Sequence, residues 1–502
     1  MPLSLKGYLN VDVCINGTRF TFKMKFFFSQ CLLASMLNDL LILMKAELVI
    51  TFIIFLLLFI KIGKGIKNES MLMLVQFLLL GNFIAGFFGN EEGSLFGDMY
   101  YTNPLIVLQK SILALGVYLI SLLFSDWLRK HEHLPEFFIL MLSALLGMYF
   151  LISSGNLLMF FLSMELATIP IAALANFDLA KRVSSEAAMK MILTSAFSSG
   201  ILLFGISILY GVTGSISFAE LPALLDGSPL LVFSFVFLFA AFAFKLSIVP
   251  FHLWTADVYE GSPFAVTSFL SVISKGALAF IFVTALYKVF QPMHAVWYNM
   301  VVLLAVATMV IGNLFALRQQ NIKRFLAFSS IAQVGFILVG VSSNSMQGTS
   351  SVVYFILIYI FSNLAAFGVA AAIASQTGKE RIDDYKGLYQ TNPFLSWVLA
   401  LALFSLAGIP PTAGFFGKLF LIASGASKGD YIFITIAALN LIVSLYYYLR
   451  VIRAVFMDKN EHPIEKITLH RQTSFGMLIC SAGIVLTGLL SWIFDRISEL
   501  SN

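Results

Sequence analysis

Blocks of about 20 consecutive apolar residues recur along most of this chain, and short polar segments separate them. An α-helix needs about 20 such residues to cross the hydrocarbon core of a bilayer. A transmembrane β-strand would instead show segments of about 10 residues with alternating polarity, and the sequence has no such pattern. The pattern therefore predicts an all-α, polytopic membrane protein.

We expect about fourteen membrane-spanning helices on this length criterion. They fall near residues 42–61, 71–89, 104–124, 136–153, 156–176, 186–211, 229–253, 263–287, 296–317, 324–342, 351–375, 395–424, 431–456 and 474–494. The segment at 395–424 is too long for one straight crossing and contains Pro410 and Pro411. Because proline has no N–H to donate, a broken helix is expected there.

The first 35 residues differ from the rest of the chain. They are mixed and mildly basic, and they lack both a long apolar core and a small-residue cleavage site, which makes a poor signal peptide. Met36 then opens a sequence that leads directly into the first predicted helix. We expect that translation starts at Met36 and that residues 1–35 are a misassigned extension.

Basic residues in the loops predict the orientation of the chain. The loops after odd-numbered helices are basic, except for ADVYEG after the seventh, whereas those after even-numbered helices are neutral or acidic. By the positive-inside rule the basic loops are cytoplasmic, so both termini face the outer side. The residues that carry this prediction are Lys61, Lys64, Lys67, Arg129, Lys130, Lys181, Arg182, Arg318, Lys323, Arg324, Lys379, Arg381, Lys386, Arg450, Arg453, Lys459, Lys466 and Arg471.

Composition narrows the possible functions. With 59% hydrophobic and 11% charged residues, the chain cannot be a water-soluble globular protein. The three cysteines are isolated, with no spacing that could hold zinc or an iron–sulfur cluster, and no Gly-rich phosphate loop or dinucleotide fingerprint opens a helix. We therefore expect no metal, nucleotide or redox cofactor in this chain, and no binding of nucleic acid.

Four charged side chains lie inside predicted membrane helices, and they are Glu165, Lys245, Lys275 and Lys418. Even on the gentler insertion scales, a charge near the bilayer centre costs about 3 kcal/mol. Such residues are retained where they have a use, and the use that fits this chain is movement of protons or ions.

Glu165 and Lys245, on the fifth and seventh helices, are expected to be partners. Burial favours the neutral form of an isolated acid or lysine, whereas an opposite charge favours the charged form of both groups. Separation of the partners would promote proton release from the lysine, which would make the pair a switch. The alternative is a structural buried salt bridge, although such pairs contribute little net stability.

Lys275 lies about twelve residues from either end of its predicted helix, and we expect it to relay protons. The alternative is snorkelling of the side chain toward the membrane surface. Lys418 lies nearer the end of its helix, where snorkelling is easier, but the adjacent break at Pro410 and Pro411 favours a place in the path.

Further polar residues leave two interpretations open. Glu186 and Lys190 are spaced i, i+4, and form either a surface pair worth a few tenths of a kcal/mol or part of the path. His252, just after Pro250, either relays protons or forms a hydrogen bond at the rim. We expect three more charges to lie at the membrane interface or to face a partner, namely Lys45, Glu47 and Lys110.

Pro250 in the seventh helix and Pro410 in the twelfth predict two broken helices, five helices apart. An odd offset means that the two units run in opposite directions, so we expect two inverted five-helix repeats. The repeats would span 136–290 (helices 4–8) and 295–458 (helices 9–13). Helices 1–3 at 36–135 would precede them, and a cytoplasmic loop with helix 14 at 459–502 would follow.

Four ordered motifs give the chain a family resemblance: MELATIPIAALA, KLSIVPFHLWTADVYEGSPFAVTSFLSVISKGA, NIKRFLAFSSIAQVGFILVG and AGIPPTAGFFGKLFLI. Together they resemble the antiporter-like subunits of respiratory complex I over essentially all of the chain from Met36. One branch of that family carries a long C-terminal lateral helix, for which this chain has no room. A second typically has a glutamate where this chain has Lys418, so the resemblance favours the third branch.

The resemblance implies a role for each buried charge: the carboxylate–lysine pair (Glu165 and Lys245), the central relay lysine (Lys275), the lysine of the proton exit (Lys418), and charged positions of the sixth helix (Glu186 and Lys190). Gln333 is a departure, because many members have a histidine at that place in the tenth helix. Glutamine cannot titrate, so a relay there would run through water or through the hydroxyls of Ser329 and Ser330.

The resemblance also implies a translocase subunit that moves protons across a bacterial inner membrane, with both termini periplasmic, as part of an NADH:quinone oxidoreductase. NADH, FMN, the iron–sulfur clusters and quinone would bind to partner subunits, and the membrane partners would be the subunits designated A, H, J, K, L and M, together with the lipid bilayer. Two alternatives stay open. One is a subunit of a multisubunit cation/proton antiporter or of a membrane-bound hydrogenase; the other is a structural membrane spacer whose buried charges only fix helix packing.

Overall fold

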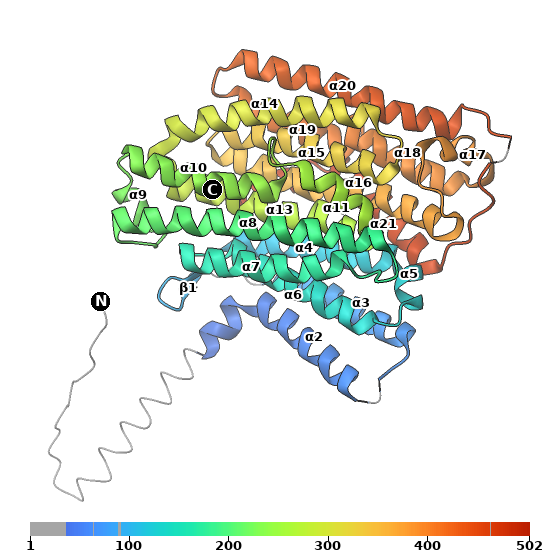
Figure 1. Ribbon diagram of the computed structural model, residues 1–502, viewed down its shortest axis with the longest axis horizontal. Helices are drawn as coiled ribbons and strands as arrows, with labels where there is room; N and C mark the ends of the chain where they lie inside the picture. The colour runs from blue at the N-terminus through green and yellow to red at the C-terminus, as the bar shows by residue number, and fades with distance from the viewer. Residues whose placement is uncertain (1–36, 64, 89–91, 462, 502) are drawn as a thin grey trace, which may run out of the picture.

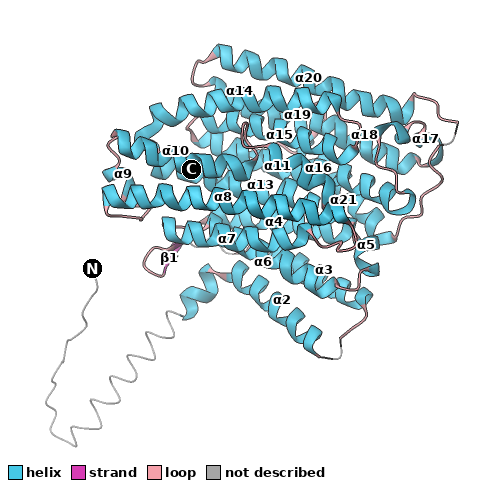
Figure 2. Ribbon diagram, in the orientation of Figure 1, coloured by secondary structure: helices cyan, strands magenta, loops and turns pink. Residues whose placement is uncertain are grey.

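The computed structural model describes residues 37–63, 65–88, 92–461 and 463–501 (Figure 1). Helices make up most of this part of the chain, and its only named strands form one short hairpin (Figure 2). The prediction of a helical membrane fold is thus confirmed. The prediction about residues 1–35 concerns a segment outside the described residues.

The N-terminal part of the described chain contains the helices α2 to α6 and the hairpin, preceded by one short helix. Their bounds are α2 Lys45–Ile62, α3 Asn68–Ala85, β1 Gly93–Leu95, β2 Tyr100–Thr102, α4 Pro104–Leu123, α5 Ser125–Lys130 and α6 Leu134–Ile152. A short helix at Leu37–Leu43 meets α2 at an angle of 88°. The strands pair antiparallel, with Leu95 opposite Tyr100.

The central part begins with two long helices and continues through a broken one. Its elements are α7 Leu157–Ala175, α8 Arg182–Thr213, α9 Leu221–Leu224, α10 Pro229–Leu246, α11 Leu253–Gly261, α12 Phe264–Ser268, η1 Phe269–Ser274, α13 Lys275–Thr284, η2 Ala285–Val289, η3 Gln291–Met293 and α14 His294–Arg318. Here η1 and η2 are π-helical, and together with α12 and α13 they form one continuous span at Phe264–Val289.

The C-terminal part repeats this combination of long and broken helices. Its elements are α15 Ile322–Ser342, α16 Met346–Thr377, η4 Ile382–Tyr385, α17 Leu388–Thr391, α18 Pro393–Ala407, α19 Ala413–Ala426, α20 Tyr431–Phe456, α21 Arg471–Leu489 and α22 Trp492–Ser501. The sequence did not predict α22, because polar residues alternate with apolar ones there and no long apolar block marks it.

Within the described residues, 12 helices are long and apolar enough to cross a membrane, or up to 13 if the bent pair at the start of α2 counts as one span. Several extend beyond the predicted blocks, such as α8, which covers Arg182–Thr213 rather than 186–211. Polar residues at the helix ends continue the backbone hydrogen bonds past the apolar stretch. A prediction from hydropathy leaves these residues out, because they are not apolar.

The centre of the fold is formed by α15 and α16. The apolar length of α15 is completely buried by its neighbours and that of α16 almost completely, whereas α3 and α20 leave most of theirs exposed. Accordingly, α20 runs along the upper edge in Figure 1 and α3 lies toward the lower edge, with the two central helices between them. Since α15 packs against α14, α16 and α19, it can connect side chains from several helices.

The first helix break, after α10, has a well-defined backbone structure. Ser247 adopts a left-handed conformation with φ of +64°, and the N–H of Ile248 donates to the carbonyl of Ala243 at 2.8 Å. This six-to-one bond is the Schellman ending of a helix. A cis bond before Pro250 follows, and α11 begins three residues later, at Leu253.

The second break, after α18, has the same structure. Gly408 has φ of +85°, the N–H of Ile409 donates to the carbonyl of Phe404 at 3.0 Å, and a cis bond precedes Pro411. Both breaks were predicted from their prolines and are confirmed. Ile248 and Ile409 therefore occupy equivalent positions in the same backbone motif.

Candidate functional site

Three of the four intramembrane charges are deeply buried lysines, which we call the lysine row: Lys245, Lys275 and Lys418. Their exposed fractions are 8%, 3% and 2%. Within the described residues, each ammonium group binds neutral oxygen atoms inside the protein. Snorkelling to the membrane surface is therefore not the arrangement of Lys275 or Lys418.

Lys245 lies in the last turn of α10, and its Nζ donates a hydrogen bond to Oγ1 of Thr168 on α7 at 3.0 Å. Glu165 lies one turn earlier on α7, and its carboxylate accepts a hydrogen bond from Ser199 on α8. No ion pair joins Glu165 to Lys245 among the described residues. Lys245 therefore binds the hydroxyl of Thr168, one turn from Glu165 on the same helix. It does not contact the Glu165 carboxylate directly.

A cavity of about 30 Å³ lies between the surroundings of Lys245 and those of Lys275. Its polar lining includes Thr168, Ser195 and Lys245, and also Ser274, the residue before Lys275. A water molecule needs roughly 10–15 Å³ of such space and two to four polar partners. The cavity beside Lys245 is therefore large enough to hold a water molecule.

Lys275 is the first residue of α13 and directly follows the π-helix η1. Its Nζ donates to Oγ of Ser330 on α15 at 2.8 Å and lies 5.5 Å from the ring centre of Tyr259. π-Helical turns inside membrane helices frequently occur at functional sites, because they rotate the following side chains. Here the turn ends at the residue before the lysine.

Lys418 lies on α19, just past the second break. Its Nζ donates to the carbonyl oxygen of Leu406 at 2.6 Å, and Nε2 of Gln333 donates to the same oxygen at 3.1 Å. Pro410 has no N–H with which to satisfy this carbonyl. The two side chains thus provide the hydrogen bonds that the break removes from the helix.

The central helix α15 connects these contacts. Ser330, which binds Lys275, precedes Gln333 by three residues and so lies near it on the same helix face. Tyr448 lies 2.5 Å from the hydroxyl of Ser329 and accepts a hydrogen bond from Gln333 at 3.0 Å. The structure places both predicted serine hydroxyls beside the row, and their part in a relay stays a prediction.

Glu186 and Lys190 form the predicted ion pair, 2.9 Å apart, at the start of α8. Lys190 also binds Asp257 on α11 at 2.6 Å, and Arg324 on α15 binds Asp257 at 2.8 Å and Glu260 at 2.7 Å. Sequence reasoning missed the last three residues as a group. The available signal was ADVYEG, an acidic loop where the charge pattern called for a basic one.

His252 lies within the first break, and its side chain is buried. Its Nδ1 has no hydrogen-bond partner in the part of the chain that the structure describes. No hydrogen bond there joins it to the lysine row. Its predicted relay role therefore stays a prediction.

The prediction that Lys45, Glu47 and Lys110 lie at an interface was wrong for two of them. Glu47 and Lys110 are buried and form an ion pair of 2.6 Å, with side chains 1% and 3% exposed. The hairpin places Tyr100 directly on the pair, a cover that hydropathy cannot reveal. Lys45 is half-buried and donates to the carbonyl of Phe88.

Buried charges beside interrupted helices are the arrangement of membrane transport proteins. The chain belongs to the family described as NADH:quinone oxidoreductase/Mrp antiporter, transmembrane, whose model matches residues 154–444. The resemblance drawn from the four motifs is thus confirmed.

Comparisons with individual proteins support the same family assignment. NADH-quinone oxidoreductase subunit N of Phocaeicola vulgatus is 49% identical over 413 residues, which cover 82% of this chain and 88% of that protein. A chain of respiratory complex I from Thermus thermophilus with bound aureothin is 27% identical, with a TM-score of 0.76, over 89% of this chain and 98% of that one. A chain of the Mrp complex from Dietzia sp. shares the fold, with a TM-score of 0.82 at 20% identity over 91% and 96% of the two chains.

Potential metal ligands do not cluster in the described part of the chain. No three His, Cys, Asp or Glu side chains there lie close enough together to hold a metal ion.

Proposed function

We propose that this chain is the proton-translocating subunit N of an NADH:quinone oxidoreductase and that the lysine row carries its protons. The match to subunit N of Phocaeicola vulgatus extends over 82% of this chain and 88% of that protein, which supports the assignment. The observation that carries the proposal is that Lys275 and Lys418 both bind groups connected through one buried helix, α15.

The contacts of the row suit stepwise proton transfer. Each ammonium group binds a hydroxyl or a carbonyl oxygen, so a lysine can lose its proton without leaving a buried carboxylate unpaired. Lys245 and Lys275 exchange protons through the cavity between them. From Lys275 the path continues through the Ser330 hydroxyl, and then through water or hydroxyl groups beside Gln333, to Lys418 at the second break.

Glu165 acts on Lys245 from a distance in this proposal. Its carboxylate is held by Ser199, while Thr168 holds the lysine. A shift that brings the carboxylate to Lys245 would favour the charged lysine, and the arrangement described here favours proton release. Glu186, Lys190 and His252 would supply or orient protons near the ends of this half of the path.

The fold in this proposal has fourteen membrane segments and two inverted five-helix repeats. The bent pair at α2 and the broken pair α18–α19 would each count as one segment besides the 12 long helices. The matching motifs at Ser247 and Gly408 support the repeat. The loop charges support periplasmic termini in a bacterial inner membrane.

The redox chemistry would lie elsewhere in the complex. NADH, FMN, the iron–sulfur clusters and quinone would be bound by partner subunits, and the membrane partners would include subunits A, H, J, K, L and M. This chain would contribute the charged path alone.

The test is proton pumping by the purified complex in lipid vesicles. NADH-driven, quinone-dependent acidification is measured with Lys245→Ala and, as a control, with Lys428→Ala, which removes an exposed lysine. We expect fewer protons per NADH oxidised in the first variant and no change in the second. An unchanged ratio in Lys245→Ala would favour the membrane spacer, and absence of NADH activity from the complex would favour the antiporter or the hydrogenase.

A further inference from the structure

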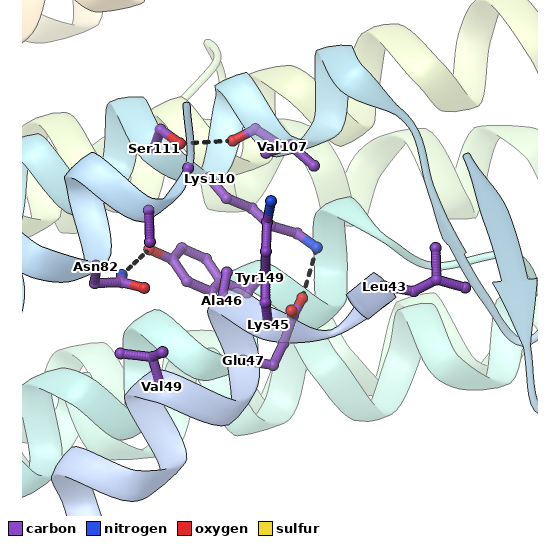
Figure 3. Close-up of a pocket in the computed structure, with 12 residues that line it drawn as sticks. Leu43, Lys45, Ala46, Glu47, Val49, Asn82, Val107, Lys110, Ser111 and Tyr149 are labelled. Carbon is purple, nitrogen blue, oxygen red and sulfur yellow. Dashed lines mark hydrogen bonds and ion pairs between the residues drawn. The ribbon is translucent and has the colours of Figure 1, made fainter. Parts of the chain in front are cut away.

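A second group of buried charges lies outside the residues that match the family model. Glu47 is at the head of α2, Lys110 is on α4, and Tyr100 comes from the hairpin. In Figure 3 the side chains of Glu47 and Lys110 point toward one another across a small pocket. The proposed lysine row makes no use of this group.

The group is closely connected by hydrogen bonds. Nζ of Lys110 lies 2.6 Å from Oε1 of Glu47 and donates to the hydroxyl of Tyr100 at 2.9 Å. The same hydroxyl lies 3.1 Å from Oε1 of Glu47. The second carboxylate oxygen, Oε2, is buried and has no hydrogen-bond partner among the residues that the structure describes.

The unpartnered oxygen belongs to a side chain that lines a cavity of about 40 Å³. Asn82, Ser111 and Tyr149 contribute polar groups to the lining, and Asn82 donates to the hydroxyl of Tyr149 at 3.2 Å. The cavity has the roughly 10–15 Å³ of space that a water molecule needs, although most of its lining surface is apolar. Lys45 also lines the cavity, and its half-buried side chain lies toward the protein surface.

A purely structural ion pair does not account for this geometry. A buried pair contributes little net stability even when every oxygen has a partner. Leaving one buried carboxylate oxygen unpartnered costs further free energy. The buried, unpartnered oxygen of a side chain that lines a cavity therefore indicates that Glu47 does more than hold the helices together.

The ligand that fits is a proton rather than a metal cation. The ammonium group of Lys110 already occupies the cation position beside the carboxylate. The other titratable groups around Glu47 are Tyr100 from the hairpin, Tyr149 from α6 and Lys45 from its own helix, whereas α3 contributes the neutral Asn82. None of these adds a second negative charge that would hold a metal ion.

We propose that Glu47 and Lys110 form a proton-exchange site between the helices of the N-terminal unit. The Lys110 ammonium passes one proton to the Glu47 carboxylate, which gives a neutral amine and a carboxylic acid. The acid releases that proton to water in the cavity, and the amine takes up another proton from water in the same cavity, which restores the ion pair. Only the destination of the released proton rests on the proposed function of the chain.

The experiment is infrared difference spectroscopy of the assembled complex during a change of pH, without NADH. We expect a carbonyl band of a protonated carboxylic acid that shifts in heavy water and is lost in Glu47→Gln. The matched control, Glu165→Gln, should keep this band. Lys110→Gln should also change this band, because it removes the ammonium group that binds the Glu47 carboxylate.

A third variant tests the cavity without touching either charge. Ala46 lines the cavity, so Ala46→Leu should fill it and slow hydrogen–deuterium exchange of the carboxylic acid severalfold. Identical difference spectra in the unmodified and Glu47→Gln complexes would overturn the proposal, as would unchanged exchange in Ala46→Leu. A response to sodium at constant pH, with none to pH, would overturn it too. Since the spectra need no NADH turnover, failure of the pumping test would leave this result unaffected.

Discussion

Nζ of Lys418 lies 2.6 Å from the carbonyl oxygen of Leu406. This oxygen lacks a helical donor because α18 ends at Ala407, before the left-handed Gly408, and Pro410 has no N–H to offer it. The helix break therefore creates the acceptor that holds the lysine inside the membrane. A proton bound at Lys418 depends on the backbone around it as much as on neighbouring side chains.

Gln333 shares this acceptor, which leads to the first prediction. Gln333→Leu removes the competing donor at 3.1 Å, so the remaining bond from Lys418 to Leu406 becomes stronger and proton release becomes slower. One hydrogen bond of about 1 kcal/mol corresponds to a roughly fivefold change in rate. We expect the rate of NADH-driven pumping to fall by about that factor.

The control for this prediction is Gln333→His. Histidine can donate to the same carbonyl, and the family resemblance places a histidine at this position, so pumping should stay near the unmodified rate. Equal pumping by Gln333→Leu and the unmodified complex would contradict the role of the shared carbonyl.

Ser330 leads to the second prediction. Ser330→Ala removes the oxygen that binds Lys275 at 2.8 Å, and the buried ammonium then lacks its hydroxyl partner. Because the proposed path leaves Lys275 through this hydroxyl, its removal should raise the barrier by about 1 kcal/mol and make the transfer roughly fivefold slower. Ser330→Thr keeps the hydroxyl and should keep most of the rate. Proton transfer per NADH oxidised is the measurement, and equal losses in both variants would point to packing instead.

The sequence identified much of this site because its strongest signals are local. A proline acts on the carbonyl four residues before it, so Pro250 and Pro410 were enough to predict both breaks. Charges within apolar blocks stand out for the same reason, which is why Lys275 and Lys418 were found without a structure. Hydropathy likewise located the long helices, although their polar ends extend further than predicted.

The contacts between helices could not be predicted in this way. Lys418 binds a main-chain oxygen, and no residue type marks such an acceptor in a sequence. Thr168 was not anticipated beside Lys245, because its helix is separated from that lysine by the whole of α8. Glu47 and Lys110 were misplaced since the hairpin that covers them carries no hydropathy signal.

Asp257 leads to the third prediction, which concerns stability. Asp257→Asn weakens two ion pairs at once, to Lys190 at 2.6 Å and to Arg324 at 2.8 Å. The groups are 30–41% exposed, so solvent screens each pair and the summed loss is about 1 kcal/mol at most. Glu186→Gln removes a single, more exposed pair and should cost less. Thermal inactivation of the complex distinguishes the two variants, and a larger loss in Glu186→Gln would contradict the network described here.

Gly408 leads to the last prediction, which separates backbone strain from the position of the lysine. Its φ of +85° disfavours any side chain by about 1–2 kcal/mol, and an added Cβ would lie 3.2 Å from Cδ of Lys418. Gly214 has a similar φ of +69°, but within the described part of the chain nothing lies within 4 Å of an added Cβ. The two alanine variants should therefore lose similar stability.

Pumping should distinguish Gly408→Ala from Gly214→Ala. The contact at Gly408 forces the Lys418 side chain to move, and its 2.6 Å bond to Leu406 then lengthens. A cavity of about 190 Å³ beside both residues leaves room for the displaced chain. We expect fewer protons per NADH oxidised in Gly408→Ala and the unmodified ratio in Gly214→Ala, in the same vesicle assay. If both variants pump equally well, the contact between Lys418 and the broken helix is structural and the exit lies elsewhere.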